Sequence, residues 1–213
     1  MKRTLLSTLA VAASAAILAM AGPATAAGPY TLTVGGSSTG TPAFTGTTTS
    51  AGISFNTPLV AMSCTSATAT GTLAPGTGVS GAAIASINAT TWSGCIGPLG
   101  LPMTVSGSGS WKLNATGTAT TGTSDNVAGN ISGVTATVSQ TGNPTACSFK
   151  VTGVVDGIFK EGTSQLQVTP PTAVGSLVIS NVVGCYGLVA NGDPADFNGT
   201  YNIASPGGAI RIS

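Results

Sequence analysis

The chain of 213 residues carries few charged side chains, which excludes most functions that depend on charge. Lysine and arginine number 6, aspartate and glutamate 5, and histidine is absent, so 5% of the residues are charged against about 25% in an average soluble protein. Binding to nucleic-acid phosphates requires clustered cations, and calcium cages require clustered carboxylates. We therefore expect no nucleic-acid partner and no cofactor. A mean hydropathy of +0.42 also differs from that of a disordered chain.

The first residues have the pattern of a secretory signal peptide. Lys2 and Arg3 precede an uncharged stretch at 5–22, and the small residues Ala24 and Ala26 fit the signal peptidase rule. We expect cleavage after Ala26 and a secreted protein, extracellular or loosely attached to the cell surface, with no transmembrane anchor. Removing two cations leaves a net charge of −1, and so little charge repulsion permits self-association.

The rest of the chain predicts β-structure. Apolar and polar residues alternate at 30–34, 53–55, 67–70, 134–138 and 177–180, and this period of two, rich in β-branched residues, is typical of strands. Glycine or proline recurs about every ten residues, at 35–36, 74–76, 107–109, 141–144 and 170–171. Asp156-Gly157 predicts a hairpin turn. No helical periodicity follows the signal, so we expect an all-β fold, an antiparallel β-sandwich or barrel.

The two halves of the chain resemble each other. Cys95 and Cys185 lie in Gly-Cys-x-Gly sequences 90 residues apart, and an aromatic residue, Trp111 or Tyr201, follows each cysteine by 16 positions. We interpret this as two pseudo-repeated units, 27–113 and 114–213, which can also pack as one domain.

The four cysteines are expected to form disulfide bonds, because secreted proteins are oxidised. Three pairings are possible, and the repeat selects Cys64–Cys95 and Cys147–Cys185, since each unit then closes its own loop. Loop entropy gives each bond about 4 kcal/mol of stabilisation as an upper figure. A zinc site is disfavoured, because the chain has no C-x-x-C spacing and no histidine.

Catalytic groups are scarce. Without histidine, a Ser-His-Asp or Cys-His arrangement is impossible, and only paired carboxylates remain. Asp193 and Asp196 flank Pro194-Ala195 and are expected on one loop, where they are weak candidates for binding Ca²⁺. We expect no catalytic residue and no enzyme; a hydrolase that uses these carboxylates is one alternative.

Aromatic residues near the second cysteine of each unit are the other candidate site. Trp92, Trp111, Tyr186 and Tyr201 either pack in the core beside a disulfide or form an exposed platform for a carbohydrate or a lipid. Core packing is the preferred interpretation, and ligand binding is the alternative.

The cysteines have a recurring sequence context in a chain that is rich in Gly, Thr, Ser and Ala. Ser63-Cys64 precedes an alternating segment, and Gly-Cys-x-Gly sequences surround Cys95 and Cys185. This framing resembles small secreted disulfide-containing β-proteins of high-GC bacteria and, more distantly, secreted protein activators of alkane oxidation. The resemblance implies a non-enzymatic extracellular protein that helps cells handle hydrophobic substrates or interfaces. We expect a binding or surface-associated structural protein whose partner is a cell-surface, glycan or hydrophobic ligand. A second alternative is an extracellular layer or fibril that assembles through exposed edge strands.

Overall fold

The computed structural model describes residues 28–169 and 177–213, and the predicted all-β fold is confirmed. The predicted signal peptide and the predicted turn at 170–171 lie outside these residues. Within them, no helix is long and apolar enough to cross a membrane. The strands are β1 (Tyr30–Val34), β2 (Ala43–Asn56), β3 (Ala61–Cys64), β4 (Ser66–Leu73), β5 (Gly76–Val79), β6 (Ala85–Ser93), β7 (Cys95–Ile96), β8 (Pro102–Gly107), β9 (Trp111–Ala115), β10 (Asn126–Gln140), β11 (Cys147–Lys160), β12 (Gln165–Thr169), β13 (Leu177–Gly184), β14 (Pro194–Ala204) and β15 (Ile210–Ile212). Three short 3-10 helices are η1 (Pro98–Gly100), η2 (Glu161–Thr163) and η3 (Cys185–Gly187).

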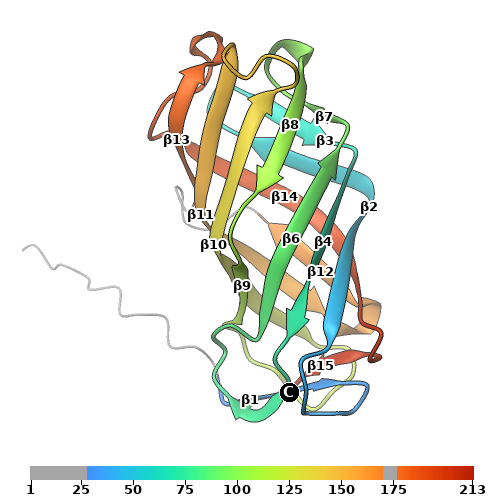
Figure 1. Ribbon diagram of the computed structural model, residues 1–213. Coiled ribbons are helices and arrows are strands. Elements are labelled where there is room, and N and C mark those ends of the chain that lie inside the picture. Colours follow the sequence, from blue (N-terminus) through green and yellow to red (C-terminus); the bar gives the residue numbers. More distant parts are fainter. Residues whose placement is uncertain (1–27, 170–176) are drawn as a thin grey trace, which may run out of the picture.

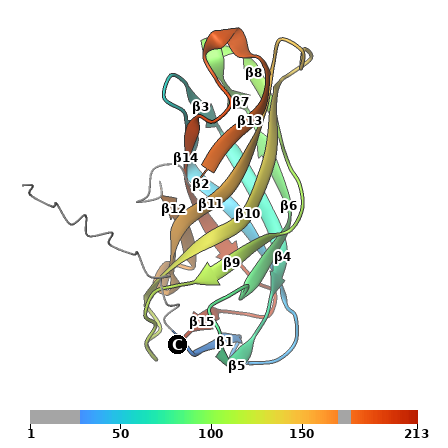
Figure 2. The same ribbon diagram turned by 90° about the vertical axis from the view of Figure 1, so that its left-hand side faces the viewer.

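Twelve of the strands form one antiparallel sheet that closes on itself. They occupy eight positions in the wall, in chain order β2, β3–β4, β6–β7, β8–β9, β10, β11, β12–β13 and β14, and each position pairs with the next. β14 then pairs with β2, from Asp196 opposite Asn56 to Ala204 opposite Thr45. Of the two predicted arrangements, the structure has the barrel, seen from two sides in Figures 1 and 2.

Each half of the chain supplies four consecutive positions of this wall. The first half supplies β2 through β9 and the second supplies β10 through β14. The halves do not close separately, because β9 pairs with β10 and β14 pairs with β2.

A separate three-stranded sheet, in the order β15-β1-β5, covers the lower end of the barrel, where the C-terminus lies (Figure 1). Leu32 of β1 is fully buried and Ile212 of β15 is nearly so. The Tyr30 hydroxyl donates a hydrogen bond of 2.6 Å to the carbonyl of Gly117. The three-stranded sheet therefore closes the lower end of the barrel.

The two predicted disulfide bonds are confirmed. Cys64–Cys95 links β3 to β7, and Cys147–Cys185 links β11 to η3, with sequence separations of 31 and 38 residues. Each bond joins segments that also meet by backbone hydrogen bonds or a ladder pair: Ser63 lies opposite Ile96, and the Cys185 amide donates to Ala146. The disulfides therefore fasten neighbouring segments of the wall within each half.

The prediction of a hairpin turn at Asp156-Gly157 is wrong. Both residues lie inside β11, where Asp156 pairs with Asn130 on one side and Thr169 on the other. A Cβ on Gly157 would lie 3.0 Å from the Gln167 carbonyl oxygen, so this glycine permits close approach of a neighbouring strand. Pairing along both edges of β11 outweighs the local turn preference.

Candidate ligand cavity

The interior of the barrel holds an apolar cavity of about 100 Å³. Alternate residues of a strand point to the same face, and the alternation noted in the sequence places apolar side chains inside. All eight positions of the wall contribute to the lining, for example through Phe44, Met62, Ile87, Val105, Val134, Val151, Val168 and Tyr201.

The lining of the cavity extends along the strands. On β10 alone its lining extends from Ile131 to Val138, which is about 20 Å of strand at roughly 3.3 Å per residue. An engineered apolar cavity of about 150 Å³ binds benzene, so a smaller volume drawn out along a barrel fits a linear chain better than a bulky ring system.

A second apolar cavity of about 70 Å³ lies nearer the lower end, between the barrel and the three-stranded sheet. Leu32 and Ile212 of that sheet contribute to its lining. Five side chains line both cavities and form the layer between them: Phe44, Leu113, Ile131, Leu166 and Ile203. Rearrangement of this layer would lengthen the upper cavity toward the lower end.

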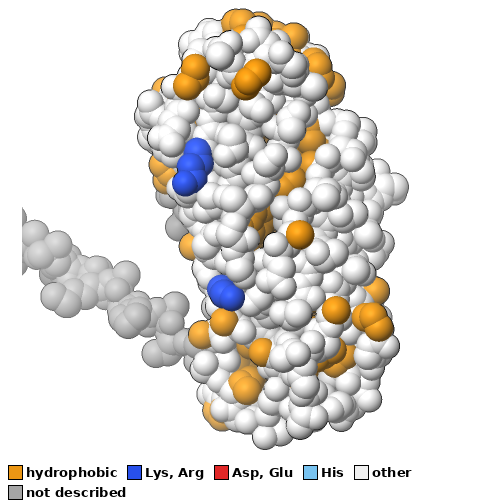
Figure 3. Space-filling model, viewed as in Figure 1, with side chains coloured by type: hydrophobic (Ala, Val, Ile, Leu, Met, Phe, Trp, Pro, Cys, Tyr) orange, Lys and Arg blue, Asp and Glu red, His pale blue; other side chains and the backbone are white. Residues whose placement is uncertain are grey.

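The wall beside the upper cavity has a gap. β6 pairs with β9 only through residues 85–87, and β7 pairs with β8 only at 95–96. In the part of the chain that the structure describes, no ladder pair joins residues 88–93 of β6 to 104–107 of β8. Half-buried Trp92 and Val105 line the cavity at this gap, and Figure 3 shows hydrophobic side chains at the surface between the two strands.

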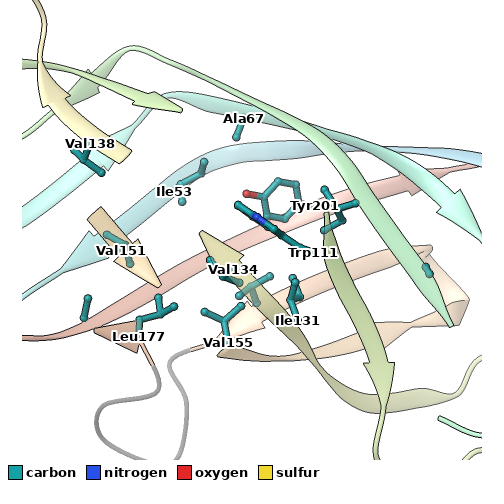
Figure 4. Packing of buried hydrophobic residues seen from close by; sticks show 14 of the residues in the cluster. Ile53, Ala67, Trp111, Ile131, Val134, Val138, Val151, Val155, Leu177 and Tyr201 are labelled. Atoms are coloured by element: carbon teal, nitrogen blue, oxygen red, sulfur yellow. The ribbon is translucent and has the colours of Figure 1, made fainter. Parts of the chain in front are cut away.

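Three of the four predicted aromatic residues line the same cavity: Trp92, Trp111 and Tyr201. The rings of Trp92 and Trp111 are 6.2 Å apart at their centroids. Trp111 and Tyr201 are 9% and 8% exposed, and Figure 4 shows both projecting into the interior. Their burial agrees with core packing, and their position on the cavity also makes them available to a ligand.

Tyr186 lies elsewhere. It is 50% exposed in η3, and its hydroxyl donates a hydrogen bond of 2.9 Å to Gln140 Oε1. Tyr186 has a left-handed backbone with a φ of +58°. It continues the turn that begins at the buried Cys185. This tyrosine is therefore outside the cavity.

The two carboxylates predicted to share a loop do not do so. Asp193 lies in a turn, where its Oδ2 accepts a hydrogen bond of 2.7 Å from the Ala190 amide. Asp196 belongs to β14 and pairs with Asn56, because the strand begins directly after the turn, at Pro194. Among the residues described, no group of three or more His, Cys, Asp or Glu side chains is arranged to hold a metal ion.

Three phenylalanines also line the cavity, Phe44, Phe55 and Phe197, and sequence reasoning did not single out the first two. Phe55 and Phe197 also lie opposite each other on β2 and β14. A strand pattern shows which residues share a face, but the pairing of β2 with β14 is needed to show that this face encloses the interior.

Comparison with protein families, with curated proteins and with solved structures finds no match. The functional proposal therefore depends on the geometry of the cavity.

Proposed function

We propose that this chain is a secreted, non-enzymatic protein that binds a linear apolar molecule inside the barrel. The observation that carries the proposal is the apolar cavity of about 100 Å³ lined from all eight positions of the wall. Barrels of about eight strands are just wide enough either to be filled by side chains or to hold one small ligand. The residual space and the gap between β6 and β8 favour the second use.

The expected affinity is modest. Burying one methylene group contributes about 0.8 kcal/mol, so a seven-carbon chain gains up to about 6 kcal/mol before the costs of association are subtracted. We therefore expect dissociation constants between about 0.1 and 10 mM for such a chain.

Two further features support secretion and an internal repeat. Disulfide bonds are typical of oxidising compartments, and the structure contains two, which supports secretion. Each half contributes four positions of the wall and one disulfide. This correspondence supports the proposal of an internal repeat that built one barrel from two similar halves.

The other functions remain predictions from the sequence. Leu59, Leu99 and Tyr186 are all exposed. These side chains could contact a hydrophobic or cell-envelope surface if the protein attaches to one. For the extracellular layer and for the carboxylate-dependent hydrolase, no contact among the described residues gives support.

The test uses the protein's own tryptophans as reporters, because the chain has two and both line the cavity. Titration of the full-length secreted protein with heptan-1-ol should produce a saturable change in tryptophan emission. Ala136 is buried and lines the cavity, so Ala136→Leu should fill part of the space and weaken binding about tenfold.

Ala89→Leu is the matched control, because Ala89 is exposed on β6, and it should bind as the wild type does. The proposal is wrong if the wild type shows no saturable response, or if both leucine variants bind as tightly as the wild type.

A further inference from the structure

The hydroxyl of Tyr201 stands apart from the other polar groups on buried aromatic side chains. The Tyr30 hydroxyl donates to the carbonyl of Gly117 at 2.6 Å, and Trp111 Nε1 donates to the carbonyl of Ser108 at 3.1 Å. Across residues 28–169 and 177–213, by contrast, the structure gives the Tyr201 hydroxyl no hydrogen-bond partner. Buried polar groups are nearly always hydrogen-bonded.

The surroundings of the Tyr201 ring are apolar. Tyr201 lines the upper cavity together with Ile53 and Ile203, and Figure 4 shows its oxygen among the interior side chains. A Cβ on Gly46 would lie 3.8 Å from the ring's Cδ1, and one on Gly199 would lie 3.4 Å from Cε2. Two glycines thus leave the ring room beside the strands.

The hydroxyl also retains accessible area. Among the described side chains, Glu161 Oε2 is the fully enclosed polar atom that lacks a hydrogen-bond partner. The partnerless Tyr201 oxygen therefore retains accessible area, and the space its side chain lines is the cavity. Burial raises the pKa of Tyr201 well above its ordinary value of 10, so the phenol stays protonated and able to donate.

The hydroxyl is not needed for packing, because phenylalanine would place the same ring against the same neighbours. A polar group in an apolar cavity without a protein partner is costly unless a ligand or a water accepts its hydrogen bond. The position is therefore better suited to a cavity that receives a hydrogen-bonding group than to one that receives hydrocarbon alone.

We infer that Tyr201 is a specificity-determining residue, which hydrogen-bonds one oxygen atom of a linear chain bound in the cavity. The preferred ligands are accordingly chains with a single hydroxyl, carbonyl or ester oxygen. This inference depends on the proposed function, because it concerns the same cavity.

The experiment compares two ligands, heptan-1-ol and n-heptane, across two variants of the full-length protein. Tyr201→Phe removes the cavity hydroxyl, and Tyr186→Phe removes the same group from the surface. Tyr201→Phe should weaken binding of heptan-1-ol about fivefold, in line with the net value of one hydrogen bond, and leave binding of n-heptane within twofold of the wild type. Tyr186→Phe should alter neither affinity.

A second measurement needs no variant. In wild-type protein labelled with ¹³C at tyrosine Cζ, the Tyr201 resonance should shift on addition of heptan-1-ol and shift much less with n-heptane. This readout stays decisive even if Tyr201→Phe folds poorly.

The outcomes separate the two proposals. If neither ligand binds the wild type, the proposed function and this inference both fall. If both bind, but Tyr201→Phe affects the two ligands equally and the Tyr201 resonance does not distinguish them, only the role of Tyr201 is overturned.

Discussion

Glu161 is a buried carboxyl group at the lower end of the barrel. It is 1% exposed, its Oε1 accepts a hydrogen bond from the Ile212 amide of β15, and its carbonyl accepts one of 3.2 Å from Arg211 Nη1. Desolvation by burial raises its pKa and outweighs the lowering effects of the Ile212 amide and the Arg211 charge. The folded protein therefore favours the protonated acid more than the unfolded chain does.

This raised pKa makes stability depend on pH. The contribution of Glu161 is fully present below its unfolded pKa of about 4.5 and is lost as the pH rises through the higher folded pKa. Glu161→Gln removes the titration, so its unfolding temperature should vary less with pH over this range, and at pH 7 it should exceed that of the wild type. Thermal unfolding followed by circular dichroism at a series of pH values measures both effects.

Asp193→Asn is the control for loss of one negative charge, since Asp193 lies in a surface turn. Equal pH profiles for the wild type and Glu161→Gln would contradict the role given to burial.

At the residue scale, spacing predicted part of the cavity. The 16-residue spacing after each Gly-Cys-x-Gly sequence identified Trp111 and Tyr201, which both line it. Tyr186 could not be separated from them, because only the left-handed turn at Cys185 directs it outward. Glu161 gave no signal either, since a lone acid in a polar segment ordinarily remains solvated.

The gap between β6 and β8 is the feature of the wall that bears most on the proposed ligand binding. Gly107, at the end of β8, faces it: a Cβ there would lie 2.3 Å from Thr90 Oγ1, 3.2 Å from the Trp111 ring and 3.3 Å from the Trp92 ring. Glycine at this position lets β8 pass close to Thr90 and the two tryptophans. We expect ligands to enter the cavity through this unpaired part of the wall.

Gly107→Ala should therefore slow ligand association. The added methyl group occupies the space between Thr90 and the tryptophans, so we expect the association rate of heptan-1-ol to fall severalfold in stopped-flow tryptophan fluorescence. Ser106→Val adds volume at an exposed neighbouring position and should leave the rate unchanged. An unaltered rate in Gly107→Ala would show that ligands enter elsewhere.

Strand existence was predictable, whereas strand length was not. Every alternating segment named from the sequence lies in a strand, yet Gly157, which was predicted in a turn, lies inside the long strand β11. Gly129 lies inside β10 in the same way. A Cβ on Gly129 would lie 2.2 Å from the Asn114 carbonyl oxygen. Glycine at such positions allows a neighbouring strand to approach closely. This role can be recognised only when the paired strands are known.

At the scale of the whole molecule, the decisive feature is closure. The sequence predicted an antiparallel sandwich or barrel from local alternation, and it predicted both disulfide pairs from the similarity of the sequences around Cys95 and Cys185. Closure depends on β14 pairing with β2, a contact between distant parts of the chain that no local signal encodes. The cavity follows from closure, so the sequence alone could name aromatic residues but not the space that they share.

A crystal structure of the protein grown with 1-bromoheptane can locate a bound chain inside the barrel, because bromine is identified by anomalous scattering. We predict a bromine peak inside the barrel, in the cavity lined by Ile53, Val134 and Tyr201, with the chain extended along the strands. Bromine found only on the outer surface at saturating ligand, with the interior filled by side chains, would contradict the proposal that this barrel binds a linear apolar molecule.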